Sequence, residues 1–460
     1  MATIDPSPVD VDTFSASISG RVIRPDDAEY DAARRVWNGM VDRYPSLVVR
    51  PRTNEDVARA IQLAREHRLD LAVRGGGHNV AGSGTCDTGV VLDLLDMNDV
   101  SVDRERRTIR VGGGCTWAQV DAEAGTFGLA TPGGLISSTG VGGLTLGGGF
   151  GWLSRMYGYS CDNLLEVELV TADGRTVKAS EDENAELFWA LRGGGGNFGV
   201  VTSLTFRGRP VDMVLGGPMF FSADRSAEVL GAYAAWAPSL PDEMTTMVAL
   251  LNAPTEPFVP SALQGQSAVA ILLCHAGDPA QGEDLVNQLR NACRPDADVV
   301  GPVPYPVLQG MLDKGAPHGI RSYWKSGYLA QLTQPVQDIL RSAAGHSPSP
   351  LSQIHVQQLG GALAAGSDGA VGHRDAAYVV NILGNGTDPR GDDANVGWVR
   401  DTWAELDPHT TGAYLNFLDG DDTARVRSAF DHGAWPRLLA AKNAWDPHNV
   451  FHVNHNFSVQ

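Results

Sequence analysis

The sequence predicts an α+β protein in two parts, a glycine-rich part of strands and helices and a second part built on a sheet with helices on it. Strand-like and helical runs alternate from residue 46 onward, and the glycine clusters stop near residue 210. Glycine makes up 54 of the 460 residues, about 12% where about 7% is usual. With 43% hydrophobic and 19% charged residues, the chain is globular and long enough for a sizeable core.

The first strand–helix–strand unit leads into a glycine loop. Residues 46–50 (SLVVR) read as a strand, and Thr53 can cap the helix that follows. Residues 69–74 form the next predicted strand and run directly into residues 75–78 (GGGH). Residues 89–94 (GVVLDL) supply a third strand.

A second unit repeats this alternation around a glycine-dense stretch. The predicted elements are a strand at 108–111, a helix after Thr116, the glycine-dense residues 132–158, a hairpin of strands 164–170 and 175–179 around the turn 172–174, a helix ending at 192–196, and a strand at 200–206.

The composition changes after Pro210. Residues 212–404 contain strand-like runs at 247–251, 269–274 and 377–382 and helical runs at 227–236 and 336–344. The last fifty residues are predicted to return to helices, with Pro436 starting the second one. We therefore expect domains at residues 1–211, 212–404 and 405–460.

The net charge and the cysteines indicate which partners the protein can bind and in which cellular compartment it lies. The chain has 35 Lys+Arg against 54 Asp+Glu, a net charge of −19, which argues against nucleic acid or an anionic membrane as partner. The N-terminal residues lack both a basic patch and an apolar stretch, and no window is apolar enough to span a membrane. Five cysteines without a Cys-x-x-Cys pair read as reduced thiols. These features predict a cytoplasmic protein.

The glycine clusters have several possible explanations. A Walker loop requires Gly-Lys-Ser/Thr, which is absent, and the Rossmann pattern G-x-G-x-x-G occurs only in pieces. Isolated glycines often mark nothing more than tight turns. Three clusters within about 125 residues favour a cradle in which successive backbone N–H groups hold a phosphate-bearing cofactor.

Four motifs, in order, carry a more specific resemblance. They are residues 73–79 (VRGGGHN) with 89–94, residues 140–143 (GVGG) with 147–158 (GGGFGWLSRMYG), residues 187–202 (LFWALRGGGGNFGVVT), and residues 414–417 (YLNF) with 446–456 (DPHNVFHVNHN). The first three resemble the flavin loops of the vanillyl-alcohol-oxidase/p-cresol-methylhydroxylase (PCMH) superfamily. The last resembles the C-terminal segment of its berberine-bridge-enzyme-like branch, in its bacterial, single histidyl-FAD type.

The resemblance implies a two-part PCMH-type FAD-binding domain at 1–211, a substrate domain with an antiparallel sheet covered by helices at 212–404, and a segment 405–460 that returns to the FAD domain. It assigns FAD binding to Arg74, Gly75, Gly76, Gly77, His78, Asn79, Gly82, Pro132, Gly133, Thr139, Gly140, Gly142, Gly143, Gly147, Gly148, Gly149, Phe150, Gly151, Trp152, Gly199, Val200, Asn454 and Asn456.

The same resemblance implies one covalent bond to the flavin. In the family, the histidine of the first loop is joined to the 8α carbon of the isoalloxazine, and His78 holds that position. Many berberine-bridge-like members add a cysteine four residues before Gly-Val-Gly-Gly, where this chain has Ile136. We therefore expect a single histidyl link, with Cys161 structural.

Three residues are candidates for the catalytic side. Tyr414 begins the family's Tyr-x-Asn-Phe motif; the alternative is packing within an apolar strand. His355 lies in an alternating strand (QIHVQ) that could face either a polar cavity or solvent, with the ordinary histidine pKa near 6.5. Thr139 precedes the Gly-Val-Gly-Gly turn, where a small side chain leaves room for oxygen. Val379 replaces the carboxylate of plant members, so berberine-type bridge formation is disfavoured.

These inferences predict an FAD-dependent oxidase that takes a hydride from an alcohol, amine or secondary metabolite and reduces O₂ to hydrogen peroxide. The alternatives are a dehydrogenase with another electron acceptor, an oxidative tailoring enzyme of secondary metabolism, and a non-catalytic flavin-binding relative. His448, His452 and His455 have a spacing that would suit a metal on a helix, but their segment reads as extended. We expect no metal and no protein partner, only a small-molecule substrate and O₂.

Overall fold

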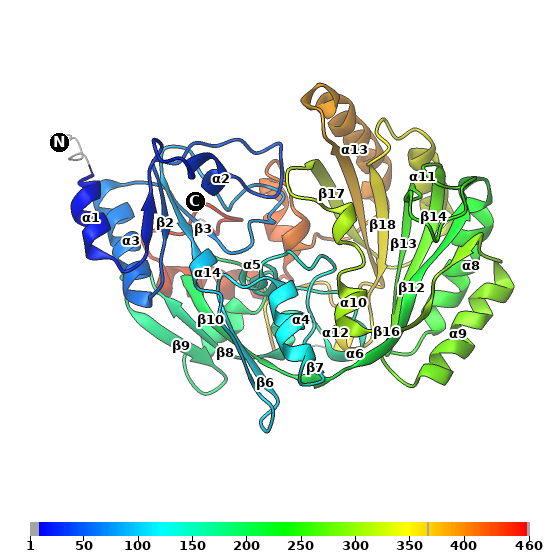
Figure 1. Ribbon diagram of the computed structural model, residues 1–460, viewed down its shortest axis with the longest axis horizontal. Helices are drawn as coiled ribbons and strands as arrows, with labels where there is room; N and C mark the ends of the chain where they lie inside the picture. Colours follow the sequence, from blue (N-terminus) through cyan, green and yellow to red (C-terminus); the bar gives the residue numbers. More distant parts are fainter. Residues whose placement is uncertain (1–8, 366–367, 458–460) are drawn as a thin grey trace.

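The computed structural model describes residues 9–365 and 368–457. Figure 1 shows two halves: blue, cyan and red segments from both ends of the chain form one, and the green to yellow middle of the chain forms the other. We call them the glycine-loop half and the large-sheet half. The predicted α+β class, with an antiparallel sheet covered by helices, is confirmed.

The glycine-loop half contains two main sheets. The first has the order β1-β2-β4-β3, with β2, β4 and β3 parallel. The second has the order β5-β6-β10-β8-β9 and is antiparallel throughout. The strands are β1 (Arg21–Ile23), β2 (Leu47–Arg50), β3 (Leu71–Arg74), β4 (Val90–Asp93), β5 (Val100–Asp103), β6 (Thr108–Gly112), β8 (Leu164–Val170), β9 (Thr176–Ser180) and β10 (Val200–Arg207), with β7 (Leu129–Ala130) pairing with β11 (Arg209–Pro210).

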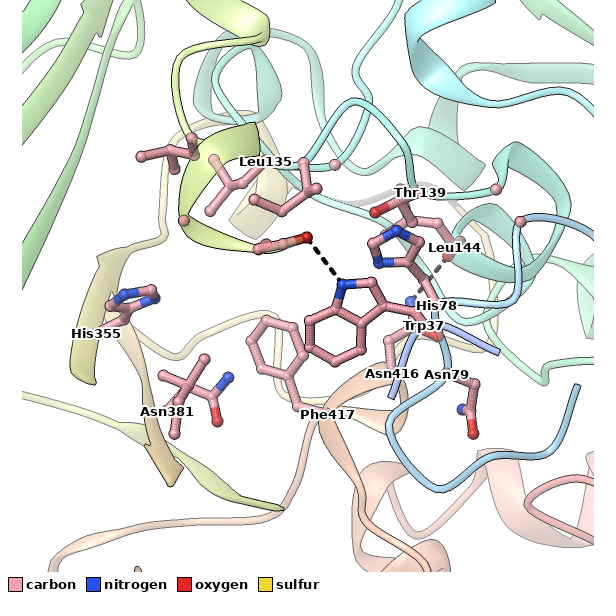
Figure 2. A pocket seen from close by; sticks show the side chains of 18 of the residues that line it. Trp37, His78, Asn79, Leu135, Thr139, Leu144, His355, Asn381, Asn416 and Phe417 are labelled. Atoms are coloured by element: carbon pink, nitrogen blue, oxygen red, sulfur yellow. Dashed lines mark hydrogen bonds between the residues drawn. The ribbon is translucent and has the colours of Figure 1, made fainter. Parts of the chain in front are cut away.

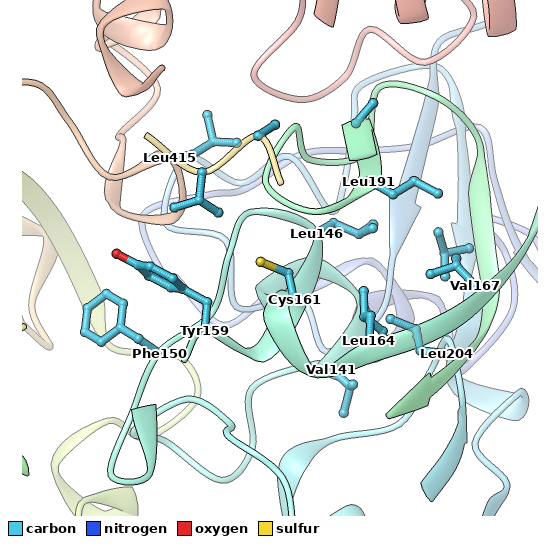
Figure 3. Packing of buried hydrophobic residues seen from close by; sticks show 14 of the residues in the cluster. Val141, Leu146, Phe150, Tyr159, Cys161, Leu164, Val167, Leu191, Leu204 and Leu415 are labelled. Carbon is cyan, nitrogen blue, oxygen red and sulfur yellow. The ribbon is translucent and has the colours of Figure 1, made fainter. Parts of the chain in front are cut away.

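Helices lie in the connections between these strands and cover the sheets. They are α1 (Val11–Ser17), α2 (Tyr30–Arg34), α3 (Asn54–His67), α4 (Trp117–Gly125), α5 (Val141–Leu146), α6 (Ser154–Tyr157), α7 (Ala185–Leu191) and α14 (Ala434–Trp445). Helix α3 begins where predicted, because Thr53 and Asp56 form a reciprocal capping box. A core that includes Val141, Cys161 and Leu204 fills the space behind the second glycine loop (Figure 3).

The large-sheet half is built on an eight-stranded antiparallel sheet of order β15-β12-β14-β13-β18-β19-β17, with β16 also paired to β12. Its strands are β12 (Met213–Ser222), β13 (Met244–Asn252), β14 (Ser267–His275), β15 (Ala297–Asp298), β16 (Gly301–Pro304), β17 (Arg321–Leu329), β18 (Gln353–Gln358) and β19 (Tyr378–Gly386). Its helices are α8 (Ser226–Trp236), α9 (Pro279–Ala292), α10 (Tyr305–Gln309), α11 (Gln334–Gly345), α12 (Ala362–Ala365) and α13 (Asp392–Leu406).

The two faces of this sheet have different environments. Side chains alternate along each strand, so Val248 and Ile271 pack on the outer face against a core that includes α8, α9, α11 and α13. Met247 and Leu272 point from the inner face toward the glycine-loop half. Helices therefore cover one face of the large sheet (Figure 1). The other face lines a cavity.

The C-terminal segment is fastened into the glycine-loop half by a buried cation. Lys442 Nζ donates to Asp446 Oδ2 at 2.7 Å, to the carbonyl of Phe451 at 2.9 Å and to the carbonyl of Asn197 at 3.0 Å. Asp446 in turn accepts the backbone N–H groups of Val450 and Phe451. A buried ion pair tolerates desolvation only with this degree of hydrogen bonding, so the segment after α14 has a fixed course.

The segment before α14 is less helical than predicted. Tyr414 precedes a 3₁₀ turn, Leu415–Phe417, and does not lie in a strand, and a second 3₁₀ stretch follows at Thr423–Ala429. Residues 419–422 (DGDD) place carboxylates on β17, where Asp421 and Asp422 bind Lys325. These long-range contacts fix the segment without a helix.

Helix α14 begins at Ala434, two residues before Pro436. Proline is tolerated there because the first turn of a helix lacks intrahelical acceptors for its N–H groups.

The first two glycine loops meet backbone to backbone. A Cβ atom on Gly76 would overlap the backbone nitrogen of Gly140, and one on Gly140 would overlap that of Gly76. Gly140 has an ordinary φ of −67°, so space alone requires glycine at that position. This contact fixes the distance between the two loops.

We expect Gly140→Ala to lower the free energy of unfolding by about 1–3 kcal/mol, because the added methyl forces the loops apart. Gly231→Ala is the matched control: it lies within α8 with nothing within 4 Å of its Cβ position, so it should stabilise by about 0.5–1 kcal/mol. Urea unfolding curves of both variants test this, and equal stabilities would contradict the close-contact argument.

Candidate active site

One large cavity lies between the two halves. Its volume is about 1160 Å³, and it is lined by all three glycine loops, by the inner face of the large sheet and by the C-terminal segment. Small-molecule pockets usually hold about 300–1,000 Å³. A cavity of this size and composition has room for a cofactor and a substrate together.

His78 lies at the wall formed by the first glycine loop. Its ring stacks on Trp37 with centroids 5.2 Å apart, and His318 approaches it edge-on at 5.4 Å. Its Nε2 is 2.8 Å from Ser138 Oγ of the second loop. Burial and the neighbouring His318 lower the pKa of His78 to about 3, so the ring is a neutral imidazole at physiological pH. Figure 2 shows His78 beside Trp37.

Many of the predicted cofactor residues line this cavity. They are Arg74, Gly75, Gly76, Gly77, His78, Asn79, Thr139, Gly140, Gly142, Gly143, Phe150, Gly199 and Asn454. Nothing lies within 4 Å of a Cβ position on Gly143 or on the neighbouring lining residue Gly196. At these two positions the backbone faces open space, as a cradle for a ligand requires.

The structure places the other predicted residues outside the cavity lining. They are Gly82, Pro132, Gly133, Gly147, Gly148, Gly149, Gly151, Trp152, Val200 and Asn456. At several of these positions a Cβ atom would overlap a neighbouring side chain. Gly147 lies against the amide of Asn416, Gly149 against Ser160, and Gly82 against Val41. These glycines let the loops pack closely against the rest of the protein, outside the cavity lining.

Arg74 borders the cavity with its guanidinium already engaged. It donates to Asp93 Oδ2 at 2.9 Å and to the carbonyls of Ala33 and Arg35. Arg74 is buried, and its stem packs against the positions of Gly77 and Gly84. The ion pair across β3 and β4 therefore supports the loop that carries His78.

The opposite wall is the inner face of the large sheet. Strand register puts Ala249 of β13, His355 of β18 and Asn381 of β19 side by side in one row, and all three line the cavity. Gln357 lies two residues from His355 on the same face and lines it too. Figure 2 shows His355 and Asn381 across the cavity from His78.

His355 has a neutral ring at physiological pH. Its Nε2 lies 2.7 Å from Gln353 Oε1. With the amide in this orientation Nε2 is the donor, which leaves Nδ1 as an acceptor. Burial lowers the pKa of His355 to about 4. This value lies below the unperturbed histidine pKa near 6.5, because β18 lies between β13 and β19 and the ring is largely removed from water.

Tyr414 lines the cavity from the C-terminal segment. Its hydroxyl oxygen accepts the N–H of Gly149 at 2.9 Å and the amide of Asn416 at 2.9 Å. Burial raises its pKa well above the ordinary tyrosine value. Tyr414 is therefore a neutral phenol that braces the second glycine loop.

The remaining residues singled out in the sequence lie partly at the cavity and partly in the core. Thr139 and Ile136 line the cavity next to the Gly140 contact. Val379 is buried in the strand beside Gln357. All five cysteines are unpaired and buried, Cys161 among them.

The three histidines of the tail do not converge. His452 lies 3.0 Å from Asp70 at the surface, whereas His455 lines the cavity. In residues 9–365 and 368–457, no group of three or more His, Cys, Asp or Glu side chains could hold a metal ion. Within the same described residues, no helix has the length and apolar character needed to cross a bilayer.

A segment of the large-sheet half closes over the second loop. Asp313 accepts the N–H of Ser137 at 2.8 Å, Gln309 donates to the carbonyl of Gly134, and the Trp37 indole donates to the carbonyl of Ala316 at 2.9 Å. These three bonds join the halves at the edge of the cavity.

Sequence reasoning missed Trp37, His318, Gln357 and Asn381. The two amides had a detectable signal, since each alternates with apolar residues on a predicted strand. Trp37 and His318 had none, because their contact with His78 is made only in the folded chain.

Comparison with known proteins gives consistent matches. A family model described as "FAD binding domain" matches residues 45–180, and one described as "Berberine and berberine like" matches residues 413–457. An FAD-linked oxidoreductase of Dictyostelium discoideum is 30% identical over 454 residues, covering 97% of this chain and 96% of that protein. (R)-6-hydroxynicotine oxidase of Paenarthrobacter nicotinovorans is 30% identical over 464 residues, covering 96% and 98%.

Solved structures agree with this. The crystal structure of 6-hydroxy-D-nicotine oxidase from Arthrobacter nicotinovorans superposes with a TM-score of 0.84 at 28% identity, covering 96% of this chain and 98% of that one. The BBE-like 1 protein of Physcomitrella patens gives a TM-score of 0.87 at 22% identity, covering 98% of this chain and 100% of that one, a likeness of fold.

The buried histidines predict how stability depends on pH. Burial lowers the pKa of His355 and of His455 to about 4 in the folded protein, against about 6.5 in the unfolded chain. Between these values the unfolded chain binds protons that the folded chain excludes. The free energy of unfolding should therefore fall as pH drops from 6.5 to 4.

His355→Gln should make that fall shallower by about 1–3 kcal/mol across the window. The exposed His432→Gln serves as control. Urea unfolding at a series of pH values gives the slopes, and an unchanged slope in His355→Gln would refute the buried-histidine assignment.

Proposed function

This chain belongs to the berberine-bridge-like FAD-linked oxidoreductases, and on that basis we propose that it is an oxidase that removes a hydride from an alcohol or amine carbon and delivers the electrons to O₂. One observation carries the proposal. A single cavity joins the glycine loops around His78 to a sheet face that bears the neutral base His355.

The residues present fit FAD. Backbone without side chains faces the cavity at Gly143 and Gly196, and such glycine turns hold phosphates through their N–H groups. His455 Nε2 and Asn454 Oδ1 are buried with no partner among the described residues, and both residues line the cavity. Both residues therefore belong to the wall that a bound cofactor would contact.

We assign proton transfer and support of the loops to different side chains of this protein. FAD, when bound, supplies the hydride acceptor and the reaction with O₂. His355 presents Nδ1 to the substrate half of the cavity and takes the proton of the substrate hydroxyl or amine. Tyr414 stays protonated and holds Gly149 in place. Of the two predicted bases, this geometry favours His355.

The covalent link is proposed at His78. Ser138 engages Nε2, which leaves Nδ1 as the nitrogen available for a bond to the flavin. Ile136 supplies no thiol at the position of a second attachment. A single histidyl bond would keep the cofactor in the protein.

Use of O₂ is supported by two observations. Thr139 is a small side chain at the cavity wall beside Gly140, and 6-hydroxynicotine oxidase, matched both in sequence and in structure, is named as an oxidase. Oxygen consumption with peroxide formation, in step with flavin bleaching under anaerobic conditions, tests the proposal. Bleaching without oxygen uptake would instead assign a dehydrogenase.

We expect the purified protein to be yellow and to keep its colour in the pellet after acid precipitation. His78→Ala should release all its FAD into the supernatant while still binding it in the native state, since the glycine loops remain. Absorbance of pellet and supernatant measures this. Flavin that stays in the His78→Ala pellet would identify another anchor.

We expect His355→Gln to slow anaerobic flavin reduction by about 10²–10⁴, the usual loss for a positioned base. Tyr414→Phe should slow it by less than about tenfold, because it removes a brace and not a proton acceptor. It should also lower the free energy of unfolding by about 1–3 kcal/mol, since the Gly149 N–H loses its acceptor. Stopped-flow measurements of anaerobic flavin reduction compare the two variants. A larger rate loss in Tyr414→Phe than in His355→Gln would make Tyr414 the base.

A further inference from the structure

The substrate half of the cavity carries no usable charge. Among the residues that line the cavity, Arg74, Glu256 and Lys314 are charged. Arg74 is paired with Asp93, and Lys314 binds Glu256 at 2.7 Å with its own side chain 84% exposed at the rim. His355 on the sheet wall is neutral. A ligand on this wall therefore meets no uncompensated ion.

Most of the sheet wall is apolar. The row that contains His355 continues through Ala249, Ala270 and Phe220 across β13, β14 and β12. The next row contains Met247 and Leu272 beside Gln357. Leu308, Met311 and Leu312 line the cavity from the segment after β16. This apolar surface can bury a flat hydrocarbon ring, but it offers no hydrogen-bond partners for the hydroxyl groups of a polyol.

Polar groups are confined to the side of the wall formed by β18 and β19. Gln357 of β18 and Asn381 of β19 line the cavity and are 5% and 2% exposed. An amide can offer either its oxygen or its nitrogen to a ligand. These amides beside His355 would pair with a hydroxyl or carbonyl.

Resting on the proposed function, we infer that the substrate is an uncharged, largely apolar ring compound whose oxidisable hydroxyl sits against His355, Asn381 and Gln357. A cation or a carboxylate would have to leave water without a counter-ion, at a cost that no contact on this wall offsets. A sugar would leave most of its hydroxyls unpaired against Met247 and Leu272.

The test uses four probes on the holoenzyme at neutral pH: 2-naphthylmethanol, 2-naphthylmethylamine, 2-naphthoate and glucose. Isothermal titration calorimetry under anaerobic conditions, where each flavin can react only once, gives the dissociation constants. The neutral alcohol should bind at least about tenfold more tightly than each of the others. Equal or tighter binding of the amine, the carboxylate or glucose overturns the inference, and so does absence of alcohol binding.

A charge placed on the wall should invert the preference. Asn381→Asp changes one atom and should tighten the amine and weaken the alcohol by about tenfold each. Asn287→Asp, an identical change on the exposed side of α9, should change neither. Gln357→Glu provides a second variant, with the same expected inversion. Preferences that stay the same in both wall variants would contradict the placement of the polar end.

The two proposals fail differently. Preferential binding of the alcohol without flavin reduction or oxygen uptake refutes the oxidase and leaves the ligand class intact. Oxidation of a charged substrate with tighter binding of charged probes refutes the ligand class and leaves the oxidase intact.

Discussion

The backbone contact between Gly76 and Gly140 is the constraint on which the site depends. Neither position has room for a Cβ atom, so the first two glycine loops can meet only as bare backbone. That contact brings Ser138 to the ring of His78 and sets the wall against which Trp37 stacks. The Arg74–Asp93 pair and the Tyr414 hydroxyl then support the two loops from behind.

The large sheet has two different faces because side chains alternate along each strand. One set of side chains packs under the helices, and the other forms a wall that is apolar over β12, β13 and β14 and amide-bearing over β18 and β19. Because the sheet is antiparallel and in register, residues from distant parts of the chain form straight rows. A histidine in such a row stays unprotonated at neutral pH, because burial disfavours the charged ring.

The sequence alone predicted the local features well and the long-range ones poorly. Strand periodicity and the hairpin at 172–174 depend on neighbouring residues, so both are found as expected. A glycine motif shows only that space is restricted. It could not tell Gly143, which faces the cavity, from Gly149, which packs on Ser160. The pKa of His355 depends on burial in the folded protein, and the engagement of Arg74 depends on Asp93 of the neighbouring strand.

The position of Lys442 has a consequence for folding. His455, Asn454 and Tyr414 complete a cavity whose loops begin at residue 74, and the Lys442–Asp446 pair locks them there. Some 380 residues separate the first loop from His455, and the whole large-sheet half is translated between them. The lining of the cavity is therefore complete only when segments from both sides of the large-sheet half have folded together.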